Sequence, residues 1–122
     1  MPRTKVVFYR EADGSVPVLE WFDTLPTKAQ DKCRIRIQRL AELGHELRRP
    51  EADLLRDRIY ELRVGLQHVN YRILYFFHGR VAAILANGLT KQDTVPDAAI
   101  ETALARRRKY EQDPKLHTFE EQ

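Results

Sequence analysis

The sequence predicts one α+β domain in which helices pack on an antiparallel β-sheet. Its 122 residues suffice for a single domain with a substantial core. Helical periodicity marks two N-terminal segments and one C-terminal segment, whereas three consecutive β-rich segments have such short connections that they must run antiparallel as a meander. The expected element order is β-α-α-β-β-β-α, and residues 1–122 contain neither a repeat nor a dividing linker.

The first strand and the first helix are short. Residues 5–9 are β-branched and aromatic, and the turn-forming pair Asp13-Gly14 follows them. Ser15 is then placed to cap a helix that has Pro17 in its first turn, and Pro26 ends that helix.

A second, longer helix completes a helical hairpin on one face of the sheet. Thr27 and Gln30 resemble a capping box at its start, and Gly44 is placed to end it. Its buried stripe is expected to comprise Ala29, Cys33, Ile37, Leu40 and Ala41. Residues 45–58 are polar and weakly periodic, which predicts a loop with one helical turn at most.

The C-terminal half contains the meander and a basic helix. The three predicted strands cover residues 59–64, 69–77 and 81–89. Pro96 lies in the first turn of the last helix, and the C-terminal half of that helix carries a basic run from Arg106 to Lys109. The tail, residues 113–122, is expected to be loosely attached.

Composition excludes several classes of protein. With 43% hydrophobic and 32% charged residues, the chain is typical of a globular domain. No apolar run approaches the roughly 20 residues of a membrane helix, and no signal-peptide region is found, so we expect a cytoplasmic protein. Cys33 is the only cysteine, which excludes an intramolecular disulfide, and its place on an apolar stripe favours a buried thiol over a nucleophile.

Two arginines are predicted to oppose each other in the first hairpin of the meander. If Arg63 faces Arg72, the connection is the segment from Leu66 to Val69, and Glu61 faces Leu74 on the same side of the sheet. This register depends on the number of residues assigned to the connection, since a slip of one residue would separate the two guanidinium groups.

A third cation joins them in the predicted second hairpin. With His78-Gly79 as a two-residue turn, Arg72 pairs with Leu85, and the residues that share its side of the sheet are Asn87, Leu89 and Lys91. Near one end of the sheet, Arg63, Arg72 and Lys91 would therefore project into the same space.

Opposed like charges destabilise a sheet by about 0.2–1 kcal/mol per pair, so something must favour this arrangement. A bound phosphate would do so, and the same cations would stabilise the charge that develops during phosphoryl transfer. The alternative is that each arginine pairs with a neighbouring acid, for which the candidates are Glu61, Asp57 and Glu51.

Other candidate site residues each have a structural alternative. His68, in the loop beside the arginines, could contact a phosphate or transfer a proton, or it could simply be exposed. Basic helix residues could bind phosphates non-specifically or form solvated helix faces, and these are Lys32, Arg36, Arg106, Arg107 and Lys109. The strand aromatics alternate like core residues, although one at the end of the sheet could stack on a base. They are Tyr71, Tyr75, Phe76 and Phe77.

Known cofactor motifs are missing from the sequence. It has no phosphate-binding loop, no dinucleotide fingerprint, no serine nucleophile elbow and no histidines spaced as metal ligands. We therefore expect neither a metal nor a cofactor, and phosphodiester cleavage would proceed without a metal ion.

Several segments, in this order, resemble the HigB-like, phage-derived branch of the RelE/ParE toxin superfamily. They are Tyr60-Glu61-Leu62-Arg63-Val64, Tyr71-Arg72-Ile73-Leu74-Tyr75-Phe76, Gly88-Leu89-Thr90-Lys91, Val95-Pro96, Arg106-Arg107-Arg108 and Asp113-Pro114-Lys115. The likeness runs from Val6 to His117 and rests on order and spacing more than on any single motif.

This resemblance implies a RelE/ParE-like fold and a toxin of a type II toxin-antitoxin pair, neutralised by a helix-turn-helix antitoxin. Toxins of the RelE and HigB type cut messenger RNA on the ribosome, and the ribose 2′-hydroxyl attacks its own 3′-phosphate without a metal. Carried over by position, Arg63 and Arg72 would hold the scissile phosphate. Lys91 would contact the backbone or assist proton transfer.

Two positions depart from the pattern of the family. Many relatives have Lys-Lys where this chain has Thr90-Lys91, and often a histidine where it has Ala86-Asn87. The departures are consistent with slower cleavage, with a role for His68, or with a protein that no longer cuts. The ParE branch poisons DNA gyrase on the same fold, so gyrase inhibition and a degenerate, antitoxin-binding role are the alternatives.

Overall fold

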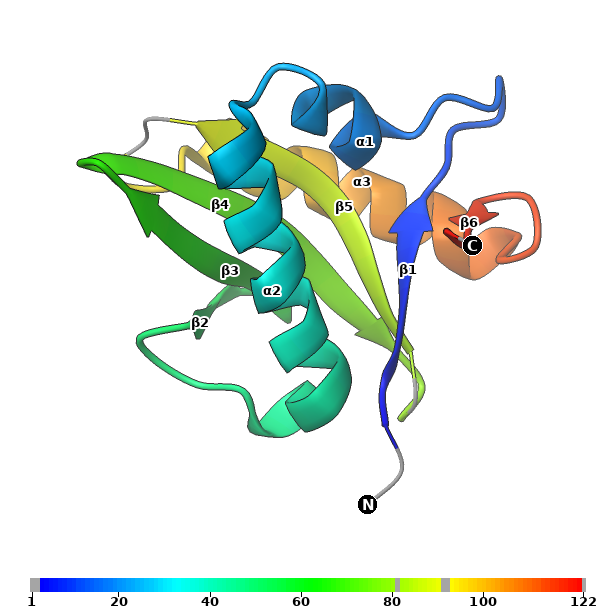
Figure 1. The fold of residues 1–122 in the computed structure, drawn as a ribbon. Coiled ribbons are helices and arrows are strands. Elements are labelled where there is room, and N and C mark those ends of the chain that lie inside the picture. Colours follow the sequence, from blue (N-terminus) through cyan, green and yellow to red (C-terminus); the bar gives the residue numbers. More distant parts are fainter. Residues whose placement is uncertain (1–2, 81, 91–92, 122) are drawn as a thin grey trace.

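The computed structural model describes residues 3–80, 82–90 and 93–121. It has an α+β fold in which helices cover both faces of a six-stranded, mostly antiparallel sheet with the strand order β2-β3-β4-β5-β1-β6 (Figure 1). The elements are β1 (Lys5–Tyr9), α1 (Pro17–Phe22), α2 (Thr27–Leu43), η1 (Gly44–Glu46), β2 (Ala52–Arg56), β3 (Ile59–Leu66), β4 (Val69–His78), β5 (Ala82–Thr90), α3 (Asp97–Gln112) and β6 (Thr118–Phe119).

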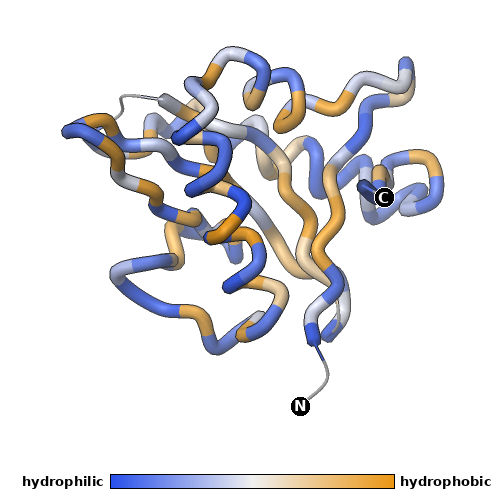
Figure 2. The backbone as a smooth tube through the Cα atoms, viewed as in Figure 1, coloured by the Kyte–Doolittle hydropathy of each residue, from blue (hydrophilic) through white to orange (hydrophobic). Residues whose placement is uncertain are grey.

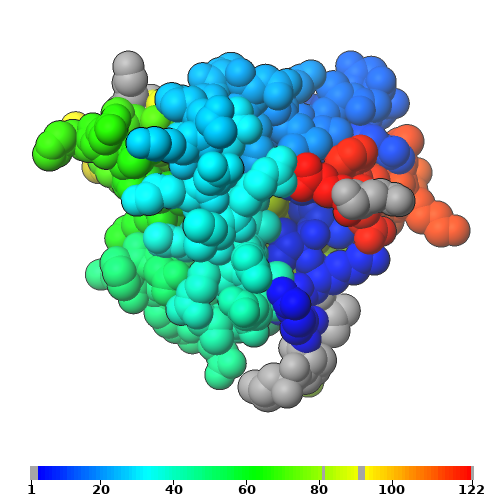
Figure 3. Space-filling model, in the orientation of Figure 1, coloured from blue at the N-terminus to red at the C-terminus, as the bar shows by residue number. Residues whose placement is uncertain are grey.

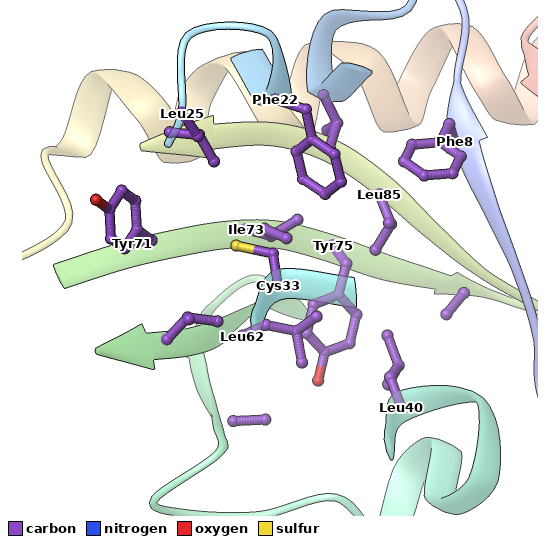
Figure 4. Packing of buried hydrophobic residues seen from close by; sticks show 14 of the residues in the cluster. Phe8, Phe22, Leu25, Cys33, Leu40, Leu62, Tyr71, Ile73, Tyr75 and Leu85 are labelled. Atoms are coloured by element: carbon purple, nitrogen blue, oxygen red, sulfur yellow. The ribbon is translucent and has the colours of Figure 1, made fainter. Parts of the chain in front are cut away.

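Two apolar clusters fix the helices to the sheet. On one face, Phe22 of α1 and Cys33 and Leu40 of α2 pack with the strand residues Ile73 and Leu85 (Figure 4). On the other face, Ile100 and Ala103 of α3 pack with apolar side chains of the strands, among them Val7, Leu74 and Ile84. The apolar colouring of the strands in Figure 2 follows from this burial on both sides.

The sheet is larger than predicted because both ends of the meander acquire further strands. Residues 52–56, expected in a loop, form the edge strand β2, which pairs antiparallel with β3. β1 lies parallel to β5, and β6 then pairs with β1.

The tail is attached more firmly than the sequence predicted. His117 is buried, its ring stacks on Tyr9, and its Nδ1 lies 2.7 Å from the carbonyl oxygen of Arg10. An ion pair of 2.7 Å between Arg34 and Glu121 links α2 to the last described residues, which lie beside it in Figure 3. Residues 113–121, predicted to be a loosely attached tail, therefore contact β1 and α2.

The predicted N-caps of the first two helices are wrong, although the helices are where they were expected and Gly44 is the C-cap of α2 as predicted. Val16 and Pro26 occupy the N-cap positions, and neither helix has a side-chain cap. Ser15 donates from Oγ to Asp13 at 2.7 Å, and Gln30 donates from Nε2 back to the carbonyl oxygen of Phe22 at 3.0 Å. In α1, Pro17 at the first helical position supplies helical φ.

The hairpin of β3 and β4 has the predicted register. Arg63 pairs with Arg72, and Glu61 pairs with Leu74. The connection is shorter than predicted, because both strands extend until only Gln67 and His68 remain between them, with φ of 52° and 67°. Positive φ at both central residues defines a type I′ turn, which matches the twist of the paired strands.

The register predicted for β4 and β5 is wrong. His78 pairs with Ala82, so the connection begins one residue later and is one residue longer than predicted, and an extra residue of β5 opposite Leu74 and Tyr75 shifts the ladder again. Arg72 consequently pairs with Leu89 rather than with Leu85. The predicted face survives, since Leu89 faces Arg72 and Asn87 faces Leu74.

The β3–β4 turn gives a testable effect on stability. We expect His68→Gly to raise the free energy of unfolding by about 1 kcal/mol, because glycine adopts φ near 67° without the steric penalty of a β-carbon. Urea denaturation measures this. His78→Gly, within β4, is the control and should be destabilising. A His68→Gly protein no more stable than the parent would contradict the expectation.

Candidate functional site

The two opposed arginines share one buried carboxylate. Glu61 is 2% exposed and lies two residues before Arg63 on β3, so both side chains project from the face of the sheet that carries α3. Arg63 donates from Nη2 to Glu61 Oε2 at 3.2 Å, and Arg72 donates from Nη1 to Glu61 Oε1. The carboxylate offsets the repulsion between the two guanidinium groups and fixes their positions.

Each arginine also donates to an acceptor other than Glu61. Arg63 Nη2 also donates to Asp53 Oδ2 at 3.0 Å, and Arg72 Nη2 donates to the carbonyl oxygen of Asp93 at 2.7 Å. Arg72 is the more enclosed, with 12% of its side chain exposed against 37% for Arg63. Both ion pairs of Arg63 use Nη2, and its buried Nε has no partner among the described residues.

An open pocket of about 440 Å³ lies against this cluster. Its charged lining residues are Arg56, Arg63, Arg72, Asp53, Glu61, Asp93 and Asp97. Arg56 is held by Asp57, Asp97 and Glu101, with the last contact at 2.7 Å. Four carboxylates thus face three guanidinium groups, so pairing with acids, the alternative raised by the sequence, is present together with an open pocket.

The described residues place two predicted helix cations beside this cluster. Arg36 donates from Nη1 to the carbonyl oxygen of Arg63 at 2.7 Å and lines a smaller pocket of about 220 Å³ with Arg63 and Arg72. Lys32 Nζ donates to the carbonyl oxygen of Gly65 at 3.2 Å. Both α2 cations therefore lie along the end of β3, where Arg36 also pairs with Glu51 at 3.7 Å.

Other predicted site residues lie elsewhere. His68 is exposed in its turn and lines neither pocket of the arginine cluster. Arg106 donates to the carbonyl oxygen of Ala86 at 2.9 Å, and Lys109 lies 3.9 Å from Glu11. Arg107 lines a different pocket at the far end of the hairpin. Lys91 lies outside the described residues.

Sequence reasoning missed Asp53 and the bridging role of Glu61. Asp53 pairs with Glu61 across β2 and β3, and β2 was predicted as a loop. The spacing Glu61-x-Arg63 opposite Arg72 was the available signal, because it places one carboxylate within reach of both guanidinium groups.

The two positions that depart from the family pattern make internal contacts. Thr90 Oγ1 accepts a hydrogen bond from Trp21 Nε1 at 2.8 Å. Asn87 is buried and donates from Nδ2 to the carbonyl oxygen of Ala99 at 3.2 Å. These side chains join α1 and α3 to β5, and neither lines the pockets around Arg63 and Arg72.

The only cysteine is a core residue. Cys33 is 0% exposed, and burial raises its thiol pKa to about 11. Because the thiolate is the reactive form, we expect no reaction of the native protein with a thiol reagent at pH 8, and complete reaction in denaturant. Absorbance with a chromogenic disulfide measures this, and rapid labelling of the folded protein would contradict it.

Among the described residues, no three His, Cys, Asp or Glu side chains are grouped as metal ligands. In residues 3–80, 82–90 and 93–121, no helix is both long and apolar enough to cross a membrane.

A mixed α+β fold with this element order and an arginine-lined pocket on the sheet is compatible with the RelE/ParE-like class of toxin domains. Residues 20–108 match the family model described as phage-derived protein Gp49-like (DUF891), and the chain belongs to this family, which is part of the RelE/ParE-like toxin group. A comparison with curated proteins gave no match.

Proposed function

We propose that this protein is a HigB-like toxin of a type II toxin-antitoxin pair and that it cleaves messenger RNA on the ribosome. Family membership and the resemblance described above support the class. The observation that carries the nuclease assignment is the pair of opposed guanidinium groups, Arg63 and Arg72, fixed by one buried carboxylate at an open pocket. Its cognate partner is a helix-turn-helix antitoxin.

The proposed reaction is a transesterification within the RNA. The ribose 2′-oxygen forms a bond to the adjacent phosphorus, the bond from phosphorus to the 5′-oxygen breaks, and a 2′,3′-cyclic phosphate results. The 2′-hydroxyl loses its proton, and the departing 5′-oxygen gains one. Arg63 and Arg72 hold the non-bridging oxygens, and their fixed positions favour the transition state because little reorganisation is needed. Lys91 and His68 are the candidate proton-transfer groups.

Cations beside the pocket and on α3 provide the proposed contacts to other phosphates of the message. Lys32 and Arg36 adjoin the arginine cluster, whereas Arg106, Arg107 and Lys109 lie along α3. Contacts of this kind depend on salt and carry no sequence information, so they would position the message rather than select a codon.

Arg63→Gln tests the nuclease assignment with little disturbance of the fold, because Glu61 keeps its contact with Arg72. Controlled expression of the parent should arrest growth with cleavage of translated messages. Arg63→Gln should reduce cleavage about 100-fold. Arg49→Gln is the matched control, since Arg49 also pairs with Asp53 but does not line the pocket. Arrested cells with intact messages would remove the nuclease assignment.

A non-nucleolytic role is the second candidate. Four carboxylates offset three guanidinium groups in the pocket, and the departures at Thr90 and Asn87 serve internal contacts. Growth arrest with an SOS response, stabilised DNA breaks and whole RNA would indicate gyrase inhibition. Harmless overexpression together with tight antitoxin binding would indicate a degenerate partner.

A further inference from the structure

A second pocket, of about 540 Å³, lies at the end of the hairpin of β3 and β4 that is remote from the Gln67-His68 turn. Its walls come from η1, the β2–β3 turn, the end of β4 and α3. It shares no lining residue with the two pockets around Arg63 and Arg72. Its volume lies within the roughly 300–1,000 Å³ of small-molecule sites.

One wall of this pocket is aromatic. The ring of His45 stacks on Phe77 with the ring centroids 3.6 Å apart, and Tyr60 meets Phe77 edge to face at 5.3 Å. His45 is exposed, and Tyr60 and Phe77 are half-buried, so the stack borders the pocket rather than the interior. Flat π-surfaces of this kind are what nucleobases stack on.

The pocket lining also includes cations. Arg58 and Arg107 line the pocket, and Glu111 is the single carboxylate among its lining residues. Neither arginine forms an ion pair with any described residue, and Arg107 donates only to the carbonyl oxygen of Asp57, at 2.6 Å. Arg56, two residues before Arg58, is in contrast paired with three carboxylates. Because Arg58 and Arg107 form no such ion pairs, they retain donors for an anion.

The backbone at Arg58 is strained. Asp57 and Arg58 form the two-residue β2–β3 turn, with φ of 51° and 63°. Glycine adopts this conformation without a steric penalty, whereas a residue with a β-carbon incurs one. Among the described residues, the Arg58 side chain has no hydrogen bond or ion pair that would offset the strain.

We propose that this pocket binds a nucleotide, with the base against the rings of His45 and Phe77 and the phosphate between Arg58 and Arg107. A free mononucleotide and one nucleotide of a single strand present the same chemistry, and the test separates them. Binding here involves no cleavage and does not depend on the proposed nuclease function.

Nuclear magnetic resonance titration of the ¹⁵N-labelled protein tests the proposal. The probes are adenosine 5′-monophosphate, a six-residue oligoadenylate, adenosine and inorganic phosphate. Adenosine 5′-monophosphate or the oligoadenylate should shift amide signals around Arg58, Phe77 and Arg107, and adenosine or phosphate alone should bind more weakly. A response to the mononucleotide indicates a free nucleotide as ligand, and a response only to the oligoadenylate indicates a strand segment.

Three variants locate the site. Arg58→Gly removes a guanidinium and relieves the turn, so loss of binding cannot reflect unfolding. Arg58→Gly and Arg107→Gln should each weaken binding about tenfold or more, as expected for a charge-assisted hydrogen bond. Phe77→Leu should weaken it about fivefold or more through loss of stacking.

Two controls distinguish binding in this pocket from non-specific attraction of the nucleotide to positive charges on the protein. Arg108→Gln removes an equal charge from the neighbouring position on α3, outside the pocket, and should leave the affinity unchanged. Arg63→Gln alters the proposed nuclease site, and the nucleotide-induced shifts of the amide signals around Arg58, Phe77 and Arg107 should survive it even if cleavage is lost or never occurs. The proposal is overturned if neither nucleotide probe binds, if Arg58→Gly binds normally, or if Arg108→Gln or Arg63→Gln weakens binding equally.

Discussion

Glu61→Gln is expected to lower the free energy of unfolding by about 3 kcal/mol, because it removes the charge that compensates two guanidinium groups, one of them largely buried. Arg63 keeps Asp53 as a partner, whereas Arg72 keeps a carbonyl oxygen that cannot neutralise it. Urea denaturation of the parent and the variant measures the loss.

A double-mutant cycle separates the pair from its surroundings. Arg72→Gln alone should be destabilising for the reciprocal reason, since Glu61 is 2% exposed. The double variant with both glutamines should be more stable than the sum of the single losses predicts, by about 2 kcal/mol. Strict additivity, or a Glu61→Gln protein as stable as the parent, would show that the shared carboxylate does not hold the site together.

Gly88→Ala is expected to disrupt the packing of α1 on β5. A β-carbon at this position would lie 2.1 Å from Cδ2 and 2.2 Å from Cε3 of Trp21, which is itself hydrogen-bonded to Thr90. A bulky ring held at its polar end has little freedom to move, so we expect a loss of about 3 kcal/mol of stability. Trp21 is the only tryptophan, so its fluorescence reports the displacement directly.

Gly65→Ala is the matched control for this steric effect. Gly65 also lies in a strand of the same sheet, but a β-carbon there has no heavy atom within 4 Å. It should unfold at the same urea concentration as the parent or slightly above it. If Gly88→Ala behaved like this control, with unchanged fluorescence, the close contact with Trp21 would be refuted.

Local chemistry explains which parts of the fold the sequence predicted. Alternating burial and a short turn determine the pairing of Arg63 with Arg72, and both signals are readable from a few adjacent residues. The register of β5 depends on a bulge at Ala86, opposite Leu74 and Tyr75, which leaves no mark in the residue pattern. Edge strand β2 has one side without a partner, and its exposed Leu54 breaks the alternation that would have indicated a strand.

Prediction of the site was limited by long-range contacts. Counting along one hairpin brought Arg63, Arg72 and Glu61 together, because all three lie on adjacent strands. Asp53 belongs to the strand that was not predicted, and Asp93 approaches Arg72 from the segment before α3. The predicted convergence of Lys91 with these arginines stays a prediction.

The parallel pairing of β1 with β5 determines the order in which parts of this chain can fold. Lys5 finds its neighbour Ala82 only after most of the polypeptide has been synthesised, and Phe119 covers the other side of β1 later still. Contacts so distant along the chain form slowly. A product truncated before residue 113 would expose the backbone groups of β1 that β6 covers, and such a fragment would tend to aggregate rather than act as a smaller version of the protein.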